Sequence, residues 1–118
     1  MRVVVKTSYE GVHCWPEAPE EVKFLRDPHR HIFEVEVKLQ VFHDDREIEF
    51  IMLKHKINKW LDAYKDDNGV WQMGRMSCEQ VALQVIKMLE REYGKNRWIV
   101  VSMYEDGENG CMVDNSDI

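Results

Sequence analysis

The residue types and spacing best suited to chemistry are those of His13, His29 and His31. His29 and His31 are two positions apart, so on an extended strand both side chains point to one side, roughly 7 Å apart along the backbone. Such a pair can bind one metal ion together with a third ligand from a neighbouring strand. His13 ends a segment with the pattern of a strand, so it can be that third ligand. Three histidine nitrogens leave a fourth position for water or substrate, which is typical of a catalytic zinc site. The spacing suits iron as well as zinc, whereas His43 and His55 are expected at the surface.

The composition is that of one globular domain spanning residues 1–118. Of the 118 residues, 44% are hydrophobic and 32% are charged, which is ordinary for a folded protein. No apolar run approaches the roughly 18 residues of a membrane span, and the N-terminal segment lacks the apolar core of a signal peptide. The net charge of −6 makes nucleic acid an unexpected partner, because proteins that neutralise many phosphates are normally basic. We therefore expect a cytoplasmic protein without membrane contact.

The cysteines and glycines exclude several common sites. Cys14, Cys78 and Cys111 are widely spaced and form no CxxC pair, which fits a reducing compartment and excludes a zinc ribbon or knuckle. No GxGxxG or Walker A motif occurs, so neither dinucleotide nor P-loop chemistry has support.

Four segments have the pattern of β-strands. Alternate residues of 2–13 share one face, and in 29–43 apolar side chains alternate with polar ones, which predicts a half-buried strand in an antiparallel sheet. The histidine pair lies on the apolar side of this second strand. Residues 97–105 and 110–114 are predicted as two further strands, joined by a turn at 108–110.

Two helices are predicted between the strand pairs. Apolar residues recur at helical spacing over 51–65. After a loop at 66–76, Ser77 and Gln80 form a capping box, and Gly94 fits the end of the helix that they begin. The order ββααββ predicts an α+β fold: an antiparallel four-stranded sheet with two helices packed on one face.

Five short motifs follow one another along the chain. They are Tyr9-Glu-Gly-Val-His13, His29-Arg-His31, Glu49-Phe-Ile-Met-Leu53-Lys54, Ser77-Cys-Glu79-Gln80 and Met103-Tyr-Glu105. In this order they resemble the motifs of the 6-pyruvoyl-tetrahydropterin and 6-carboxy-tetrahydropterin synthases, the T-fold lyases. The resemblance runs from about residue 3 to residue 113 and agrees with the predicted order of strands and helices.

The resemblance implies a metal, a ligand and an assembly. His13, His29 and His31 would hold zinc, and Glu105 would anchor the pterin ring, since a carboxylate can accept two hydrogen bonds from a 2-amino-4-oxo pyrimidine edge. The start of the second helix would line the same pocket through Ser77, Cys78 and Glu79. The resemblance also implies trimers stacked into hexamers with sites between subunits. Such a protein would serve tetrahydropterin or 7-deazaguanine (queuosine) synthesis.

The chain departs from the family pattern at the catalytic cysteine. The family has a Cys a few positions before its histidine pair, and this chain has none there. Glu20, Glu21 and Asp27 are the carboxylates available as substitutes, and Glu21 and Asp27 are our candidates. Cys14 is a second kind of candidate, a thiol displaced in the sequence.

A second departure follows the first helix, where the family has an Asp-His pair as a proton relay. This chain has no His there, and Asp62, Asp66 and Asp67 are the acids available, with Asp67 as our candidate. Arg30 also replaces the Gly that the family places between its two histidines. A cation there can favour a phosphate or carboxylate on the ligand, or simply face solvent.

Three functions remain open from the sequence. The first is a zinc-dependent lyase or isomerase acting on dihydroneopterin triphosphate or a related dihydropterin. The second is a zinc-containing protein that binds a pterin or purine-like ligand without turning it over, which the missing Cys and His favour. The third is an oligomeric structural protein whose histidines only hold strands together.

Overall fold

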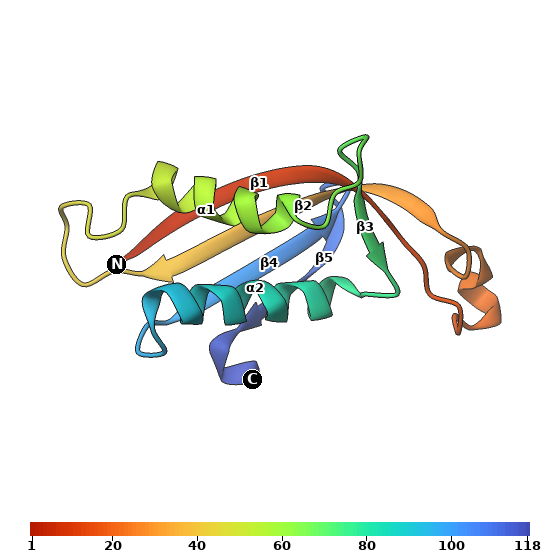
Figure 1. Cartoon of the computed structure of the whole chain (residues 1–118). Helices are drawn as coiled ribbons and strands as arrows, with labels where there is room; N and C mark the ends of the chain where they lie inside the picture. The colour runs from red at the N-terminus through yellow and green to blue at the C-terminus, as the bar shows by residue number, and fades with distance from the viewer.

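A five-stranded sheet with two α-helices along one face forms the core of the protein (Figure 1). A computed structural model describes all residues, 1–118. Its elements in chain order are β1 (Arg2–His13), η1 (Glu20–Leu25), β2 (His29–Gln40), α1 (Phe50–Asp62), β3 (Trp71–Gly74), α2 (Cys78–Tyr93), β4 (Ile99–Glu105), β5 (Asn109–Asp114) and η2 (Asn115–Asp117).

The strands lie in the order β3-β1-β2-β4-β5. β1 and β2 are antiparallel, and their register places His13 opposite His29 and Gly11 opposite His31. β2 and β4 are also antiparallel, with Phe33 opposite Glu105. Because side chains alternate between the faces of a strand, this register places side chains from the adjoining ends of β1, β2 and β4 on the same face of the sheet.

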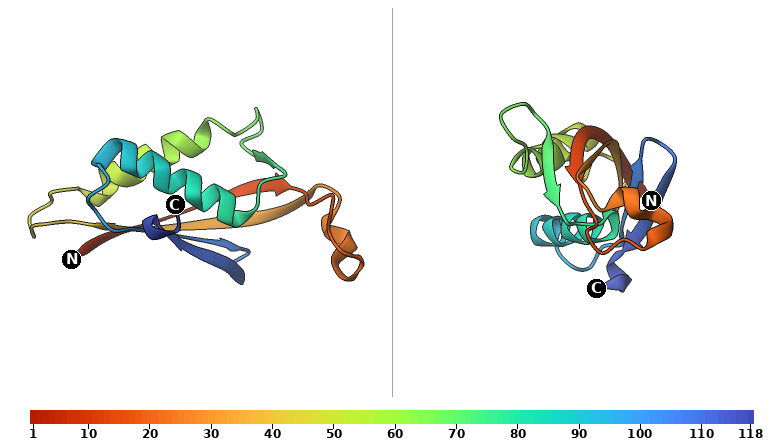
Figure 2. Two further views of the ribbon diagram at one scale, coloured as in Figure 1. Left: turned by 90° about the horizontal axis from the view of Figure 1, so that it is seen from below. Right: turned by 90° about the vertical axis from the view of Figure 1, so that its right-hand side faces the viewer.

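That face carries the core. Figure 2 shows both α-helices on one side of the sheet and the other side bare. The alternation predicted for the strand at 29–43 is confirmed, since its inward apolar side chains are buried, but the strand ends at Gln40. The fully buried side chains include Phe33, Leu39, Leu53, Ile57, Val81, Val85, Leu89, Ile99 and Met103. Burying an aliphatic or aromatic side chain of this kind contributes roughly 1.5–3 kcal/mol.

Both helices begin where the sequence provides a cap. The Glu49 carboxylate accepts hydrogen bonds from the amides of Ile51 and Met52, so the first helix starts at Phe50. The predicted capping box of Ser77 and Gln80 is present at the start of α2. Such caps satisfy amides that have no partner inside the helix.

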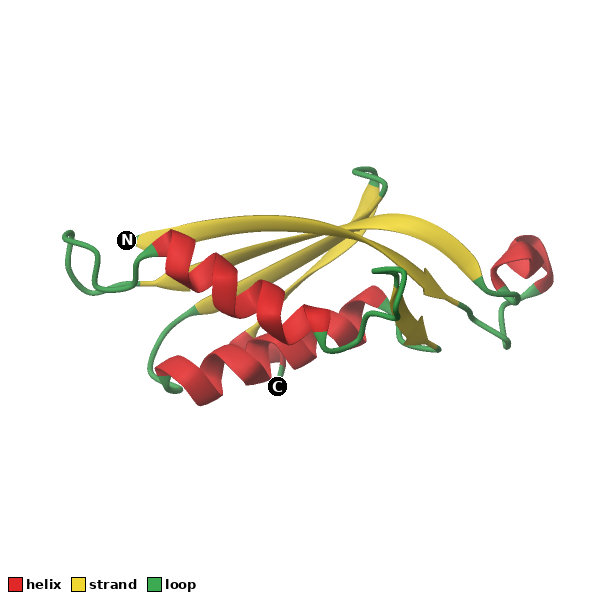
Figure 3. Ribbon diagram, turned by 45° about the horizontal axis from the view of Figure 1, so that its top comes forward, coloured by secondary structure: helices red, strands yellow, loops and turns green.

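The predicted four-stranded, all-antiparallel sheet is wrong in one element. Residues 66–76 were expected to form a loop, but Trp71–Gly74 form β3, which pairs in parallel with the end of β1. Figure 3 shows this short strand beside the end of the sheet, where the chain passes from α1 to α2. Its four residues are too few for a period of two to be distinguished from chance.

Two smaller expectations also differ from the structure. The helix predicted over 51–65 ends at Asp62. The turn predicted at 108–110 lies instead at 106–108, where Asp106 and Gly107 have φ angles of 56° and 69°. Asp tolerates this left-handed conformation better than most residues. No helix is both long and apolar enough to cross a membrane.

Candidate metal centre

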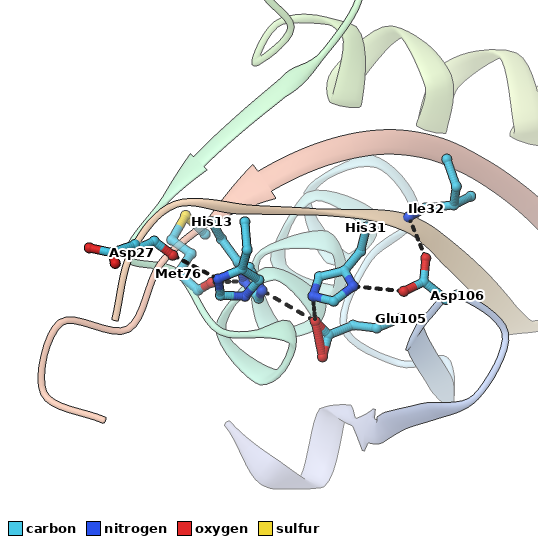
Figure 4. Close-up of polar contacts among 8 residues, drawn as sticks. His13, Asp27, His31, Ile32, Met76, Glu105 and Asp106 are labelled. Atoms are coloured by element: carbon cyan, nitrogen blue, oxygen red, sulfur yellow. Dashed lines mark hydrogen bonds and ion pairs between the residues drawn. The ribbon is translucent and has the colours of Figure 1, made fainter. Parts of the chain in front are cut away.

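Three histidines and a glutamate meet where β1, β2 and β4 end or begin (Figure 4). His13 is the last residue of β1, His29 and His31 open β2, and Glu105 is the last residue of β4. One ligand atom from each of the four lies within 4.8 Å of the others. The predicted grouping of the three histidines is therefore what the structure shows.

The sheet register explains why these side chains meet. His29 and His31 share the inward face of β2, and His13 lies opposite His29 on β1. Phe33 continues the same face and is fully buried. Its ring centroid lies 5.2 Å from that of His13 and 5.6 Å from that of His31. An apolar platform therefore closes the cluster on the core side.

Each histidine has its Nδ1 atom beside an oxygen. The Nδ1 of His13 lies 3.2 Å from the carbonyl oxygen of Met76, and that of His29 lies 2.8 Å from the carbonyl oxygen of Asp27. The Nδ1 of His31 lies 2.7 Å from a carboxylate oxygen of Asp106. A carbonyl oxygen can only accept, so the Nδ1 atoms of His13 and His29 carry the proton and donate it.

The Nε2 atoms then face inward without a proton in the neutral ring. Oε2 of Glu105 lies 2.9 Å from Nε2 of His31 and 3.2 Å from Nε2 of His13. Nε2 of His31 is nevertheless buried and has no hydrogen-bond partner, because with the proton on Nδ1 neither this nitrogen nor the Glu105 carboxylate has a hydrogen to donate. Inward lone pairs beside a carboxylate are the donor set of a cation site. Outer hydrogen bonds to Nδ1 are usual for metal-bound histidines.

The electrostatics agree with a neutral His13. Burial lowers the pKa of His13, an effect that outweighs the hydrogen bond to the Met76 carbonyl and the charge of Glu105. A neutral imidazole is the form that binds a metal ion. The residues present therefore fit a zinc ion with nitrogen and oxygen ligands.

The residues predicted to bind a ligand differ in their distance from the histidine cluster and in their exposure to solvent. Glu105 lies in the cluster. Ser77 is half-buried and caps α2, and Cys78 is buried, which raises the pKa of its thiol to about 12. Glu79 is exposed on the first turn of the same helix. Their predicted role in binding a ligand remains a prediction.

The predicted catalytic acids lie outside the metal-ligand group. Glu21 is exposed on η1, Asp27 is exposed just before β2, and Asp67 is exposed in the loop after α1. Asp27 contacts His29 through its backbone carbonyl, whereas Cys14 directly follows His13 and is half-buried. Their catalytic roles remain predictions.

The other acids of the α1–β3 loop have structural partners. Asp66 accepts hydrogen bonds from the amides of Asn68 and Val70 and from the side chain of Gln72. Asp62 forms an ion pair with Lys65 at 2.7 Å. Asp67, the acid predicted for the proton relay, has no such partner, unlike Asp62 and Asp66.

One further residue at the site, Asp106, was not predicted, and it supplies the oxygen beside His31. Met76 begins the segment 76–80 that the resemblance places at the pocket, and it supplies a carbonyl beside His13. An acid directly after Glu105 was a visible signal for Asp106, but its partner depends on the pairing of β4 with β2. Arg30 pairs with Glu10 at 2.8 Å, and its side chain is largely exposed.

Comparisons with known proteins give a structural likeness only. No family model and no curated protein sequence matches the chain. Its structure resembles that of a 6-pyruvoyltetrahydropterin synthase from Plasmodium vivax in which a catalytic glutamate is changed to alanine, with a TM-score of 0.67 and 18% identity. The 6-pyruvoyl tetrahydropterin synthase of Plasmodium falciparum is similar at a TM-score of 0.67 and 17% identity. Each likeness covers 98% of this chain and 97% of the other, so the chain has the fold of these synthases.

Proposed function

We propose that this is a zinc protein of the pterin-synthase type, in which His13, His29 and His31 hold the ion beside a pterin site. The observation that carries the proposal is the hydrogen bonding of the three histidines. Every Nδ1 faces an acceptor, and the Nε2 atoms of His13 and His31 lie beside the carboxylate of Glu105. The shared fold supports the same reading, because the similar structures are those of pterin synthases.

The proposed reaction is a lyase or isomerase step on dihydroneopterin triphosphate or a related dihydropterin. Bound zinc supplies Lewis acidity, which polarises a hydroxyl or carbonyl of the substrate side chain. Glu105 accepts hydrogen bonds from the pyrimidine edge and so orients the ring. A carboxylate then takes the proton that the side chain releases.

Glu21 is our first candidate for that carboxylate. The P. vivax synthase has a glutamate named as its catalytic residue, which supports an acid in place of the missing thiol. Glu21 lies in η1, on the segment that leads into β2 and the histidine pair. Asp27 and Asp67 are the alternatives.

A second candidate function is binding without turnover. It is favoured by the exposure of Glu21, Asp27 and Asp67, none of which joins the group of metal-ligand atoms. A general base works best within hydrogen-bond reach of the proton it removes. In this function the same centre binds a pterin or purine-like ligand and releases it unchanged.

We expect self-association with either candidate function. β5 is a sheet edge, and β3 covers only the last residues of β1, so most of β1 is an edge as well. Open edges of this length favour pairing with another chain. We propose a trimer or hexamer with sites between subunits, in a reducing compartment such as the cytoplasm, where the three free cysteines stay reduced.

The deciding experiment is turnover with and without the metal centre. Protein purified with zinc is mixed with excess dihydroneopterin triphosphate, and the products are followed by mass spectrometry beside His31→Ala. Conversion by the wild type but not by His31→Ala supports the enzyme. Recovery of intact substrate, together with saturable binding that needs His31, supports the binding protein. Neither conversion nor binding contradicts both functions for this substrate.

A further inference from the structure

We propose that Glu105 is the fourth protein ligand of the metal centre, so that the resting site is closed. This inference rests on the metal centre proposed above and adds a fourth protein ligand to its three histidines. A site with three histidines leaves one position open, whereas three histidines and a carboxylate complete the four ligands of a closed zinc site. The resemblance assigns Glu105 to the pterin ring instead.

The contacts of Glu105 support a bond to a cation. Its Oε2 atom lies 2.9 Å and 3.2 Å from Nε2 of His31 and of His13, and its side chain is 30% exposed. No lysine or arginine pairs with it; both its charged-group contacts are with these histidines. A half-buried carboxylate beside two imidazole nitrogens needs a positive partner, which is either a proton on Nε2 or a cation between them, and a bound metal ion is that partner for all three atoms at once.

The β4–β5 turn holds Glu105 in this position. The next residue, Asp106, reaches around His31 and places Oδ2 2.7 Å from its Nδ1, while Oδ1 accepts a hydrogen bond from the amide of Ile32 at 2.9 Å. The Asp106 amide in turn donates to the Ile32 carbonyl at 2.8 Å. Consecutive carboxylates thus face both nitrogens of one imidazole, as Figure 4 shows.

A closed centre has a consequence for ligand binding. One carboxylate cannot be a metal ligand through Oε2 and at the same time offer both oxygens to a pyrimidine edge. A pterin that uses Glu105 therefore has to draw this carboxylate away from the metal, which opens the fourth position as the ligand arrives. Small anions that lack a pyrimidine edge have no means of doing this.

Cobalt(II) and azide test the fourth position directly. The zinc-free full-length protein is loaded with Co²⁺ and titrated with azide while the visible spectrum is recorded. We expect little change for the wild type and a saturable spectral change for Glu105→Ala, in which azide takes the vacated position. Glu108→Ala is the matched control, because Glu108 is an exposed acid of the same turn outside the metal-ligand group. It should behave as the wild type does.

Zinc affinity gives a second readout. In competition with a chromophoric chelator, we expect Glu105→Ala to bind zinc at least about tenfold more weakly than Glu108→Ala. Circular dichroism checks that both variants fold. If Glu105→Ala loses cobalt altogether while Glu108→Ala keeps it, Glu105 is likewise a ligand.

Two other results overturn the inference and are distinguishable. Equal azide responses and equal zinc affinities of wild type and Glu105→Ala would show an open three-histidine centre, which leaves the proposed function intact. Failure of the wild type to bind either metal would overturn the metal centre itself, and the closed site with it.

Discussion

At the scale of single residues, the site is built from two layers of contacts. The inner layer consists of the imidazoles and Glu105, and the outer layer fixes the direction of each ring through its Nδ1 atom. Two of the outer partners are backbone carbonyls, which substitution cannot remove. Asp106 is the one outer partner that a mutation can delete.

Replacing Asp106 by alanine should weaken zinc binding. His31 loses the carboxylate that fixes its Nδ1–H and orients its ring, and losing an outer partner of this kind typically costs roughly 10- to 100-fold in metal affinity. Chelator competition measures the change. Asp106→Asn retains one acceptor oxygen and should lie between alanine and wild type, and an alanine variant with unchanged affinity would contradict the role.

Gly11 is a second residue on which the cluster depends. A Cβ atom at this position would lie 2.8 Å from the ring of Phe33, which supports the His13 and His31 rings. We expect Gly11→Ala to destabilise the fold by about 1–3 kcal/mol, as overpacking of a core does. Urea unfolding measures this. Ser8→Ala, at an exposed position of the same strand, should stay within about 0.5 kcal/mol of the wild type.

At the scale of elements, the features that could be predicted from the sequence are those that depend on hydrophobic periodicity and on helix-capping residues. The buried face of β2, the capping box of α2 and the shared side of the histidine pair all depend on residues close in sequence, so local patterns were enough. β3 depends on a partner about 60 positions away in β1, and nothing in four residues specifies it. For the same reason Asp106 was missed, since its role comes from the pairing of β4 with β2.

The end of the sheet opposite the metal centre is held by one ion pair. Arg97, before β4, pairs with Glu47, before α1, and also donates to the carbonyl of Gln40. The hydrogen bonds from Arg97 and from the Phe42 amide lower the pKa of Glu47 to about 2. These contacts tie the segment before α1 to the adjoining ends of β2 and β4, which the sheet already pairs.

This ion pair predicts how acid affects stability. The pKa of Glu47 in the folded chain is below its ordinary value, so its contribution is complete above about pH 4.5 and is lost as the pH falls towards 2. Glu47→Gln should therefore lower the free energy of unfolding at pH 7 and have little further effect near pH 2. Urea unfolding at several pH values measures the difference between the two proteins. A difference independent of pH would show that the charge of Glu47 is not what stabilises the folded chain.

At the scale of the whole molecule, one face of the sheet lacks a cover. The helices bury the inward face, while the outward face carries charged side chains. Among them, Glu36 on β2 pairs with Lys6 on the neighbouring β1 and with Lys38 on its own strand. Its edge strand β5 exposes Met112, with 64% of its surface accessible. An apolar side chain on an open edge strand suits contact with a second chain.

Replacing Met112 by aspartate should therefore disrupt the assembly and leave the subunit folded. A charge on each copy of the edge strand would be buried against a neighbour without a partner, which is costly. Light scattering after size exclusion should give a multiple of 14.1 kDa for the wild type and a lower multiple for Met112→Asp. Met52→Asp changes an equally exposed methionine, 62% accessible, on α1, and should leave the mass unchanged. A wild type that runs as a monomer would contradict the assembly. It would also place the complete ligand site within one chain, since no second subunit could contribute to it.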